Sequence, residues 1–237
     1  MIKLNDITLY FGGLAALSNV SLEIGSHEVV GLVGPNGAGK TTLFNVISGL
    51  ALPSRGQVIF DTKDVLKAPL HAKARMGIGR TFQIPQPMHE LTVRENLIVA
   101  QRFGTGSVDT DEIDEILAFL NLSSKADQDA ATELSLTELK ALEVAKAMAT
   151  RPKLLLLDEV LAGLESHGKR LFLKTLKELH AKYKISIFII EHDIETISNF
   201  CPRICVLNFG QLIADGTPEE VFNDPAVIEG YTGGGDA

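Results

Sequence analysis

The stretch "GPNGAGKTT", residues 34–42, comes directly after the apolar run "EVVGLV" (28–33) and before "LFNVISGL" (43–50). Its spacing matches G-x-x-x-x-G-K-[ST], and an apolar strand before it with a helix after it is the context that this motif requires. Glycines let the backbone turn its N–H groups inward around an anion, and the helix adds the positive end of its dipole. The stretch therefore predicts an α/β fold with a phosphate-binding loop.

Each residue type in this loop has a chemical reason to be there. Lys40 has the reach to contact the β- and γ-phosphates of a nucleotide, and the Thr41 hydroxyl is a ligand suited to Mg²⁺. The remaining candidates form the loop around the phosphates; they are Gly34, Pro35, Asn36, Gly37, Ala38, Gly39 and Thr42. All of them except Pro35, which has no main-chain N–H, can donate from the backbone.

An acidic pair follows a second apolar run, in "LLLLDE" at residues 154–159. Alone, this pattern is typical of a buried strand that ends in a solvated acidic turn. Together with the phosphate-binding loop, it predicts that Asp158 holds Mg²⁺ and that Glu159 orients or deprotonates the attacking water.

Composition narrows the classes of protein that fit. The chain has 237 residues and a net charge of −8, which argues against a nucleic-acid partner. No apolar run approaches the roughly 20 residues of a membrane-spanning helix, and the N-terminus is unlike a signal peptide, so we expect a cytosolic chain. Cys201 and Cys205 are too few for a four-ligand metal site, and we expect reduced, buried thiols.

The hydrophobic pattern predicts where the elements lie. Strands are expected near 2–9, 19–24, 28–34, 57–60, 154–158 and 186–191, followed by a hairpin over 204–216; helices are expected near 40–49, 92–101, 111–121, 168–182 and 193–200. Thr92 is a plausible N-cap. The region 86–150 is helical and interrupts the α/β pattern, so we expect a helical subdomain there, with residues 1–85 and 151–237 forming the rest of one domain.

The order of motifs resembles that of the ATP-binding cassette (ABC) family. It runs from the phosphate loop through "RTFQ" (80–83), the stretch 134–148 and "LLLLDE" to "IIEHD" (189–193). The resemblance implies an antiparallel β subdomain, a mixed α/β core, a helical subdomain, ATP and Mg²⁺. It assigns Gln83 to Mg²⁺ or the attacking water, His192 to the γ-phosphate, and Phe11, beside Tyr10, to stacking on adenine.

More narrowly, the chain resembles the ATPase subunits of bacterial branched-chain amino acid importers. The resemblance lies in "RTFQIPQPMHELTVRENL", "EHDIETI" and the tail "GTPEEVFNDPAVIEGYTG". It implies a second ATPase subunit, membrane permease subunits, a solute-binding protein and a place at the cytoplasmic face of the membrane. Cassettes for urea, amides or lipopolysaccharide share these features, so the solute stays open. We also expect "IPQPMHELTV" (84–93) to face the permease.

The stretch "LSLTELKALEVAKAM" (134–148) departs from the family, in which it usually begins LSGGQ. Ser135 is kept, while Leu136 and Thr137 replace the glycines. Ser135 and Glu138 also fit a capping box that opens a helix to about Ala149. Binding of a partner's γ-phosphate and helix capping are compatible interpretations. Glu165 stands where the family often has aspartate, so a cassette that binds ATP but hydrolyses it weakly remains an alternative.

Overall fold

The computed structural model describes residues 1–232 of the chain. These residues belong to two compact units: the first combines Met1–Leu70 with residues 186–232, and the second is His71–Ile185. The second unit contains residues 86–150, the region expected to form a helical subdomain, together with two strands and further helices. Each unit positions its own set of candidate residues.

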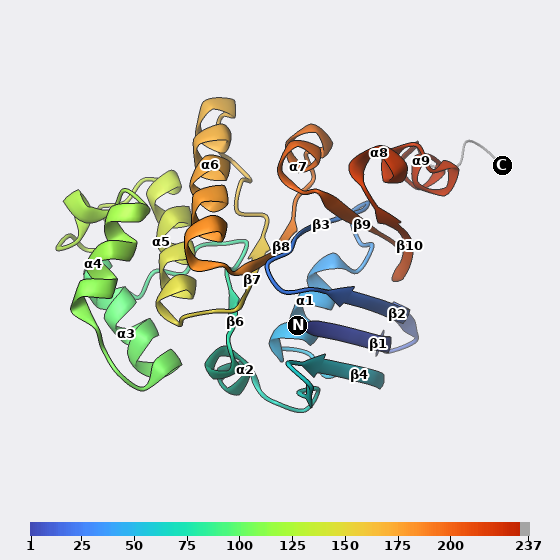
Figure 1. Cartoon of the computed structure of the whole chain (residues 1–237), viewed down its shortest axis with the longest axis horizontal. Coiled ribbons are helices and arrows are strands. Elements are labelled where there is room, and N and C mark those ends of the chain that lie inside the picture. The colour runs from blue at the N-terminus through green and yellow to red at the C-terminus, as the bar shows by residue number, and fades with distance from the viewer. Residues whose placement is uncertain (233–237) are drawn as a thin grey trace. The chain divides into compact units, whose positions relative to one another are not determined.

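The first unit begins with an antiparallel sheet whose order is β2-β1-β4-β5 (Figure 1). Its strands are β1 (Ile2–Phe11), β2 (Leu14–Ile24), β4 (Arg55–Phe60) and β5 (Lys63–Asp64). In β1 and β2 one face is buried and the other exposed, as expected for a sheet that covers a core on one side only. This is the antiparallel β subdomain that the resemblance implies.

A second set of strands in the same unit has the order β10-β9-β3-β8. β3 (Val29–Val33) pairs in parallel with β8 (Ser186–Ile190) and β9 (Arg203–Asn208), and β9 forms a hairpin with β10 (Gln211–Gly216). Every residue of β3 and β8 is buried, which is typical of parallel strands covered on both faces. The helices of this unit are α1 (Lys40–Ser48), α7 (Ile194–Phe200), α8 (Pro218–Phe222) and α9 (Pro225–Thr232).

The second unit pairs two short parallel strands, β6 (Ile78–Arg80) and β7 (Leu154–Asp158). Its helical elements are α2 (Leu70–Met76), α3 (Val93–Thr105), α4 (Thr110–Phe119), η1 (Ser123–Lys125), α5 (Leu136–Ala149) and α6 (Ser166–Tyr183). Thr92 is the N-cap of α3, as predicted, and it also forms a capping box with Glu95. On α4 and just after it, Ile113, Ile116, Leu117 and Leu120 are buried, which confirms the predicted apolar face.

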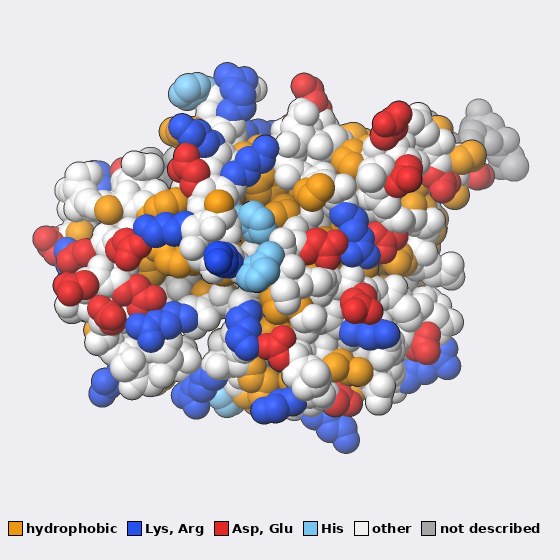
Figure 2. Space-filling view, in the orientation of Figure 1, with side chains coloured by type: hydrophobic (Ala, Val, Ile, Leu, Met, Phe, Trp, Pro, Cys, Tyr) orange, Lys and Arg blue, Asp and Glu red, His pale blue; other side chains and the backbone are white. Residues whose placement is uncertain are grey.

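Charge is segregated among the helices of the second unit. Figure 2 shows acidic side chains gathered over α3 and α4 and basic side chains over α6. The ion pair between Lys182 of α6 and Glu115 of α4 joins the two groups. Because such exposed pairs contribute little to stability, the packing of these helices rests on their apolar faces.

Cys201 and Cys205 are buried thiols outside any disulfide, as predicted. Burial raises the pKa of the Cys205 thiol well above its usual value. A buried thiol that stays protonated is a weak nucleophile, so these residues act as small apolar groups in the first unit.

Candidate functional site

The phosphate-binding loop lies between β3 and α1, in the first unit. At Gly34, a Cβ would stand 2.0 Å from the Leu207 carbonyl oxygen, and at Gly39 it would stand 2.5 Å from the Ala16 carbonyl oxygen. Both residues also have positive φ, at 146° and 102°. Only glycine combines that backbone with such close approach, so these two positions fix the path of the loop.

Lys40 stretches across the loop that precedes it. Its buried ammonium donates hydrogen bonds to the main-chain oxygens of Gly34 at 2.7 Å and Pro35 at 2.9 Å. Asn36, Gly37 and Thr41 are exposed, Thr42 is half-buried and Ala38 is buried. The loop thus presents its middle residues and one hydroxyl to solvent, with a positive charge held across its base.

His192 lies at the same end of the parallel strands as the phosphate-binding loop. β3 and β8 are parallel with Leu32 opposite Ile190, and Gly34 and His192 each follow two residues later. The carboxyl ends of parallel strands lie on the same side of the sheet. The register therefore brings Gly34 and His192 to the end of the sheet where ligands bind in α/β folds. The His192 side chain is exposed there.

Two neighbouring aromatic rings end β1. Tyr10 is 53% exposed and Phe11 is 59% exposed. Phe11 lies opposite Leu14 across the hairpin, and the next strand brings Ala16 against Gly39 of the loop. The hairpin that carries both rings is therefore packed on the phosphate-binding loop, and both rings are open for stacking.

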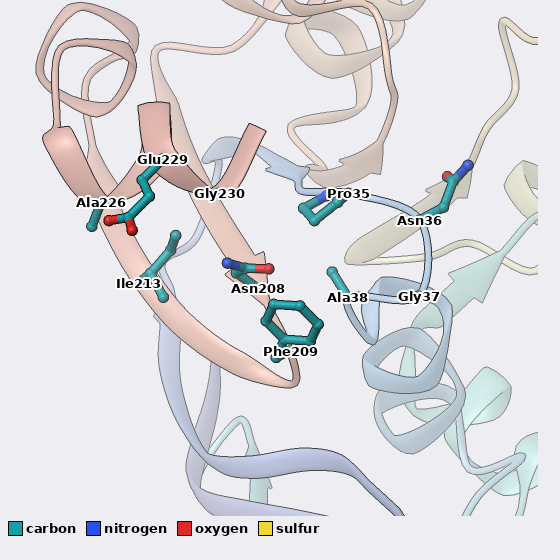
Figure 3. A pocket seen from close by; sticks show the side chains of 10 residues that line it. All are labelled: Pro35, Asn36, Gly37, Ala38, Asn208, Phe209, Ile213, Ala226, Glu229 and Gly230. Carbon is teal, nitrogen blue, oxygen red and sulfur yellow. The ribbon is translucent and has the colours of Figure 1, made fainter. Parts of the chain in front are cut away.

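The C-terminal helix α9 also contacts the loop. A cavity of about 460 Å³ lies beside the loop. Its lining residues come from the loop on one side and from the β9–β10 hairpin and α9 on the other (Figure 3). Its lining includes Pro35, Ala38, Asn208, Phe209 and Glu229. The Gly34 amide also donates a hydrogen bond to the phenol oxygen of Tyr231, and burial raises the pKa of Tyr231 to about 12. Sequence reasoning assigned no role to this residue.

In the second unit, Asp158 ends β7 beside the end of β6. Its carboxylate is buried and forms an ion pair with Arg80 at 3.0 Å. The Asp158 amide donates to the Thr81 hydroxyl at 3.2 Å, which fixes the strand ends together. Burial lowers the pKa of Arg80, and Asp158 opposes that shift. Sequence reasoning missed Arg80; because β6 was not predicted, no local pattern pointed to its contact with Asp158.

Glu159 and Gln83 meet directly. The Gln83 amide nitrogen donates to the Glu159 carboxylate at 2.6 Å, although 76 positions separate them in the chain. Glu159 also has a left-handed backbone, with φ of 50°. That conformation is less favourable for a residue with a Cβ than for glycine, so the surrounding structure must hold Glu159 in it.

Ser135 begins α5 as its N-cap. Its hydroxyl accepts from the Glu138 amide, and the Glu138 carboxylate accepts from the Ser135 amide, so the predicted capping box is confirmed. Leu136 and Thr137 are both exposed. Leu136 also packs against the turn at Gly163, where a Cβ would lie 3.1 Å from the leucine Cδ2. The helix end is thus capped and carries two side chains around its free N–H groups.

The fold and these sites define a P-loop nucleotide-binding protein with an acidic strand end. A model of the ABC transporter family matches residues 17–162, and a model described as branched-chain amino acid ATP-binding cassette transporter matches residues 211–237. The chain belongs to the ABC transporter family, and it is an ATP-binding and ATP-hydrolysing subunit of that family.

Individual relatives match over nearly the whole chain. The high-affinity branched-chain amino acid transport ATP-binding protein LivG of Salmonella typhimurium is 36% identical, with 98% of each chain covered. The structure of the ADP conformation of MJ1267, an ATP-binding cassette of an ABC transporter, is 34% identical, with 98% of each chain covered and a TM-score of 0.88.

A third relative is relevant to assembly. The dimeric post-hydrolysis structure of the cassette MJ0796, bound to ADP and Pi, is 27% identical and covers 92% of this chain and 99% of its own, with a TM-score of 0.82. Within residues 1–232 of the present chain, no helix has the length and apolar character to span a membrane.

Proposed function

We propose that this chain powers the import of branched-chain amino acids as the ATPase subunit of an ABC importer. The observation that carries this proposal is the match of residues 211–237 to the model for branched-chain amino acid cassettes. The full-length similarity to LivG supports it. The membrane permease and the solute-binding protein would be separate chains, and this subunit would sit on the cytoplasmic side of the permease.

Within this proposal, the first unit binds the nucleotide. Phe11 stacks on adenine, with Tyr10 as the neighbouring alternative. The loop from Gly34 to Thr42 surrounds the phosphates with N–H groups, and Lys40 exchanges its contacts to the Gly34 and Pro35 carbonyls for phosphate oxygens. His192 contacts the γ-phosphate.

The donor set fits Mg²⁺. Thr41, Gln83 and Asp158 offer hydroxyl, amide and carboxylate oxygens, which are the hard ligands that Mg²⁺ prefers. If held there, Mg²⁺ would offset the negative charge of the phosphates.

Glu159 is the proposed general base, and Gln83 orients the attacking water beside it. Their 2.6 Å hydrogen bond supports this pairing. The N-terminus of α5, with Ser135, is proposed to contact the ATP held by a second cassette, because free N–H groups and the helix dipole favour an anion there. ATP binding would bring the two cassettes together, and the predicted helical subdomain over 86–150 would transmit that movement to the permease.

The first test replaces the proposed base. Glu159→Gln should keep ATP affinity. It should lower turnover by at least about a thousandfold, because the attacking water loses its base and its positioning contact together. An ATP-bound dimer should then accumulate. Nucleotide-binding titrations, phosphate release and size-exclusion chromatography with Mg-ATP measure these effects. Hydrolysis at the wild-type rate would remove Glu159 from its proposed role.

The second test identifies the solute. A strain lacking this chain should lose uptake of radiolabelled leucine, isoleucine and valine, and the gene supplied on a plasmid should restore it. The tagged chain should also co-purify with integral membrane permease subunits. Intact leucine uptake in the deletion strain, with loss of urea or amide uptake instead, would reassign the solute.

A further inference from the structure

The helix α5 carries three charged side chains, Lys140, Glu143 and Lys146, spaced three residues apart. Residues at this spacing lie along one side of a helix. Lys140 and Glu143 are only 3% and 4% exposed. Burying charges is costly unless each is paired or hydrogen-bonded, so this row requires specific partners.

Those partners belong to the segment that begins with Gln83. The Gln86 amide donates to the Glu143 carboxylate at 2.9 Å, and the Lys146 ammonium donates to the Gln86 carbonyl at 2.6 Å. The Lys140 ammonium donates to the Gln83 carbonyl at 3.3 Å. One side of α5 therefore fixes the main chain of residues 83–86 at both ends.

Lys140 makes one more bond, to the main-chain oxygen of Glu159 at 3.0 Å. Glu159 has the left-handed backbone described above, and its carbonyl also accepts from the Ala162 amide. A charged donor strengthens such a bond and helps to hold a backbone conformation that is otherwise unfavourable. One ammonium thus joins the carbonyls of the two residues whose side chains meet at 2.6 Å.

We propose that Lys140 is a positioning residue of the ATPase, holding Gln83 and Glu159 at the separation that water activation requires. It acts on both through their main chains and does not contact the nucleotide. Lys140 follows Ser135 by little more than one helical turn. It therefore also connects Gln83 and Glu159 to the helix end that is proposed to contact the partner's ATP. The inference rests on the proposed roles of Glu159 and Gln83.

The test is Lys140→Met, which keeps an unbranched apolar side chain, one atom shorter than lysine, and removes the charge and the donors. Misplacing two catalytic groups should lower kcat roughly tenfold to a hundredfold, while the KM for ATP stays within about threefold because the phosphate loop is intact. Lys140→Gln keeps one amide donor group and should fall between the wild type and Lys140→Met. Phosphate release under saturating Mg-ATP gives kcat, and fluorescent-nucleotide titration gives affinity.

A matched control separates positioning from general stability. Lys73 on α2 is a second fully buried lysine of the same unit. Lys73→Met should lower the melting temperature and leave kcat unchanged. A mutant cycle completes the test: if Lys140 acts through Gln83, then Lys140→Met combined with Gln83→Ala should cost less than the product of the two single losses.

Three outcomes would overturn the proposal: a Lys140→Met enzyme with wild-type kcat, a loss of kcat matched by equal losses of nucleotide affinity and melting temperature, or strict additivity in the cycle. If Lys140→Met does not fold, Lys140→Gln decides by the same criteria. The Glu159→Gln variant distinguishes failure of the proposed function from failure of the role proposed for Lys140. Normal turnover in that variant would defeat the proposed function itself, whereas its inactivity with a fully active Lys140→Met would defeat only the role of Lys140.

Discussion

At the residue scale, Glu165 shows how one methylene group changes a local interaction. It occupies the N-cap of α6, with extended φ and ψ of −67° and 159°, yet its side chain makes no capping hydrogen bond. The backbone is that of a normal N-cap, but glutamate is not among the side chains favoured there. The helix therefore begins without the cap that aspartate would provide.

Glu165→Asp should stabilise the protein. A new cap is worth about 1 kcal/mol, which corresponds to a rise in melting temperature of about 2–4 °C for a chain of this size. Differential scanning calorimetry measures the change. Glu165→Gln is the control, because it removes the charge without shortening the side chain and should give no such rise. An equal rise in both variants would show that charge, not capping, limits this position.

At the element scale, the N-terminus of α5 combines a structural and a proposed functional role. Ser135 caps the helix, and Leu136 and Thr137 stand exposed around its free N–H groups. If this end binds a phosphate of the partner's ATP, the two side chains obstruct access to an anion site that is otherwise complete.

Replacing both Leu136 and Thr137 with glycine should therefore tighten ATP-driven dimerisation. One added hydrogen bond to a charged group is worth about 1.5–3 kcal/mol, or roughly ten- to a hundredfold in affinity. Analytical ultracentrifugation of the wild type and the double variant with Mg-ATP measures the affinity of dimerisation. Ser135→Ala should weaken dimerisation and also lose about 1 kcal/mol of capping energy. Lower melting temperature with unchanged dimerisation and hydrolysis would reduce this stretch to a helix cap.

The helix α9 is a second element of interest, because it contacts the phosphate-binding loop although the two are far apart in the sequence. The Gly34 amide donates to the Tyr231 phenol oxygen, so removing that oxygen leaves the first amide of the loop without this partner. Tyr231→Phe should lower ATP affinity about two- to tenfold, the value of a hydrogen bond worth 0.5–1.5 kcal/mol. Equilibrium titration with a fluorescent nucleotide measures this. Tyr183→Phe, which changes a tyrosine in the second unit, is the matched control. Equal affinities in the two variants would exclude a role for Tyr231 in shaping the loop.

At the scale of the whole molecule, the segment 84–93 is the expected contact with the permease. Ile84 is 71% exposed and therefore free of the packing that holds the rest of the segment. Met88 and Leu91 are half-buried, and the Met88 amide donates to the Asn96 side chain at 2.9 Å. A charge at Met88 or Leu91 would disturb the loop itself, so Ile84 is the better position at which to test the contact.

Ile84→Glu should impair transport and spare the ATPase of the isolated subunit, because the charge meets only solvent until the permease binds. Leucine uptake in cells and phosphate release from the purified chain separate the two activities. His89→Glu, an equal change at another exposed position of the segment, is the control for added charge. Parallel loss of uptake and isolated ATPase activity would count against a coupling role for Ile84.

The sequence by itself determined the main features that depend on local chemistry. The phosphate loop, the acidic strand end, the capping boxes at Thr92 and Ser135 and the main helices and strands follow from spacing and periodicity, and the structure contains them. Such features depend on neighbours within a few residues, so their signals stand side by side in the chain. The short elements β5, β6, α2, α8 and α9 lack long periodic patterns and were not predicted.

Only the tertiary structure decided which distant groups meet. The contacts of Arg80 with Asp158, Gln83 with Glu159, Lys140 with two main-chain oxygens and Tyr231 with Gly34 each join residues that are far apart in the chain. Three of these four partnerships involve a residue that sequence reasoning did not single out. A lysine on a helix or a tyrosine near a terminus has no local signal for its partner, because the partner is brought to it by the register of strands and the packing of helices.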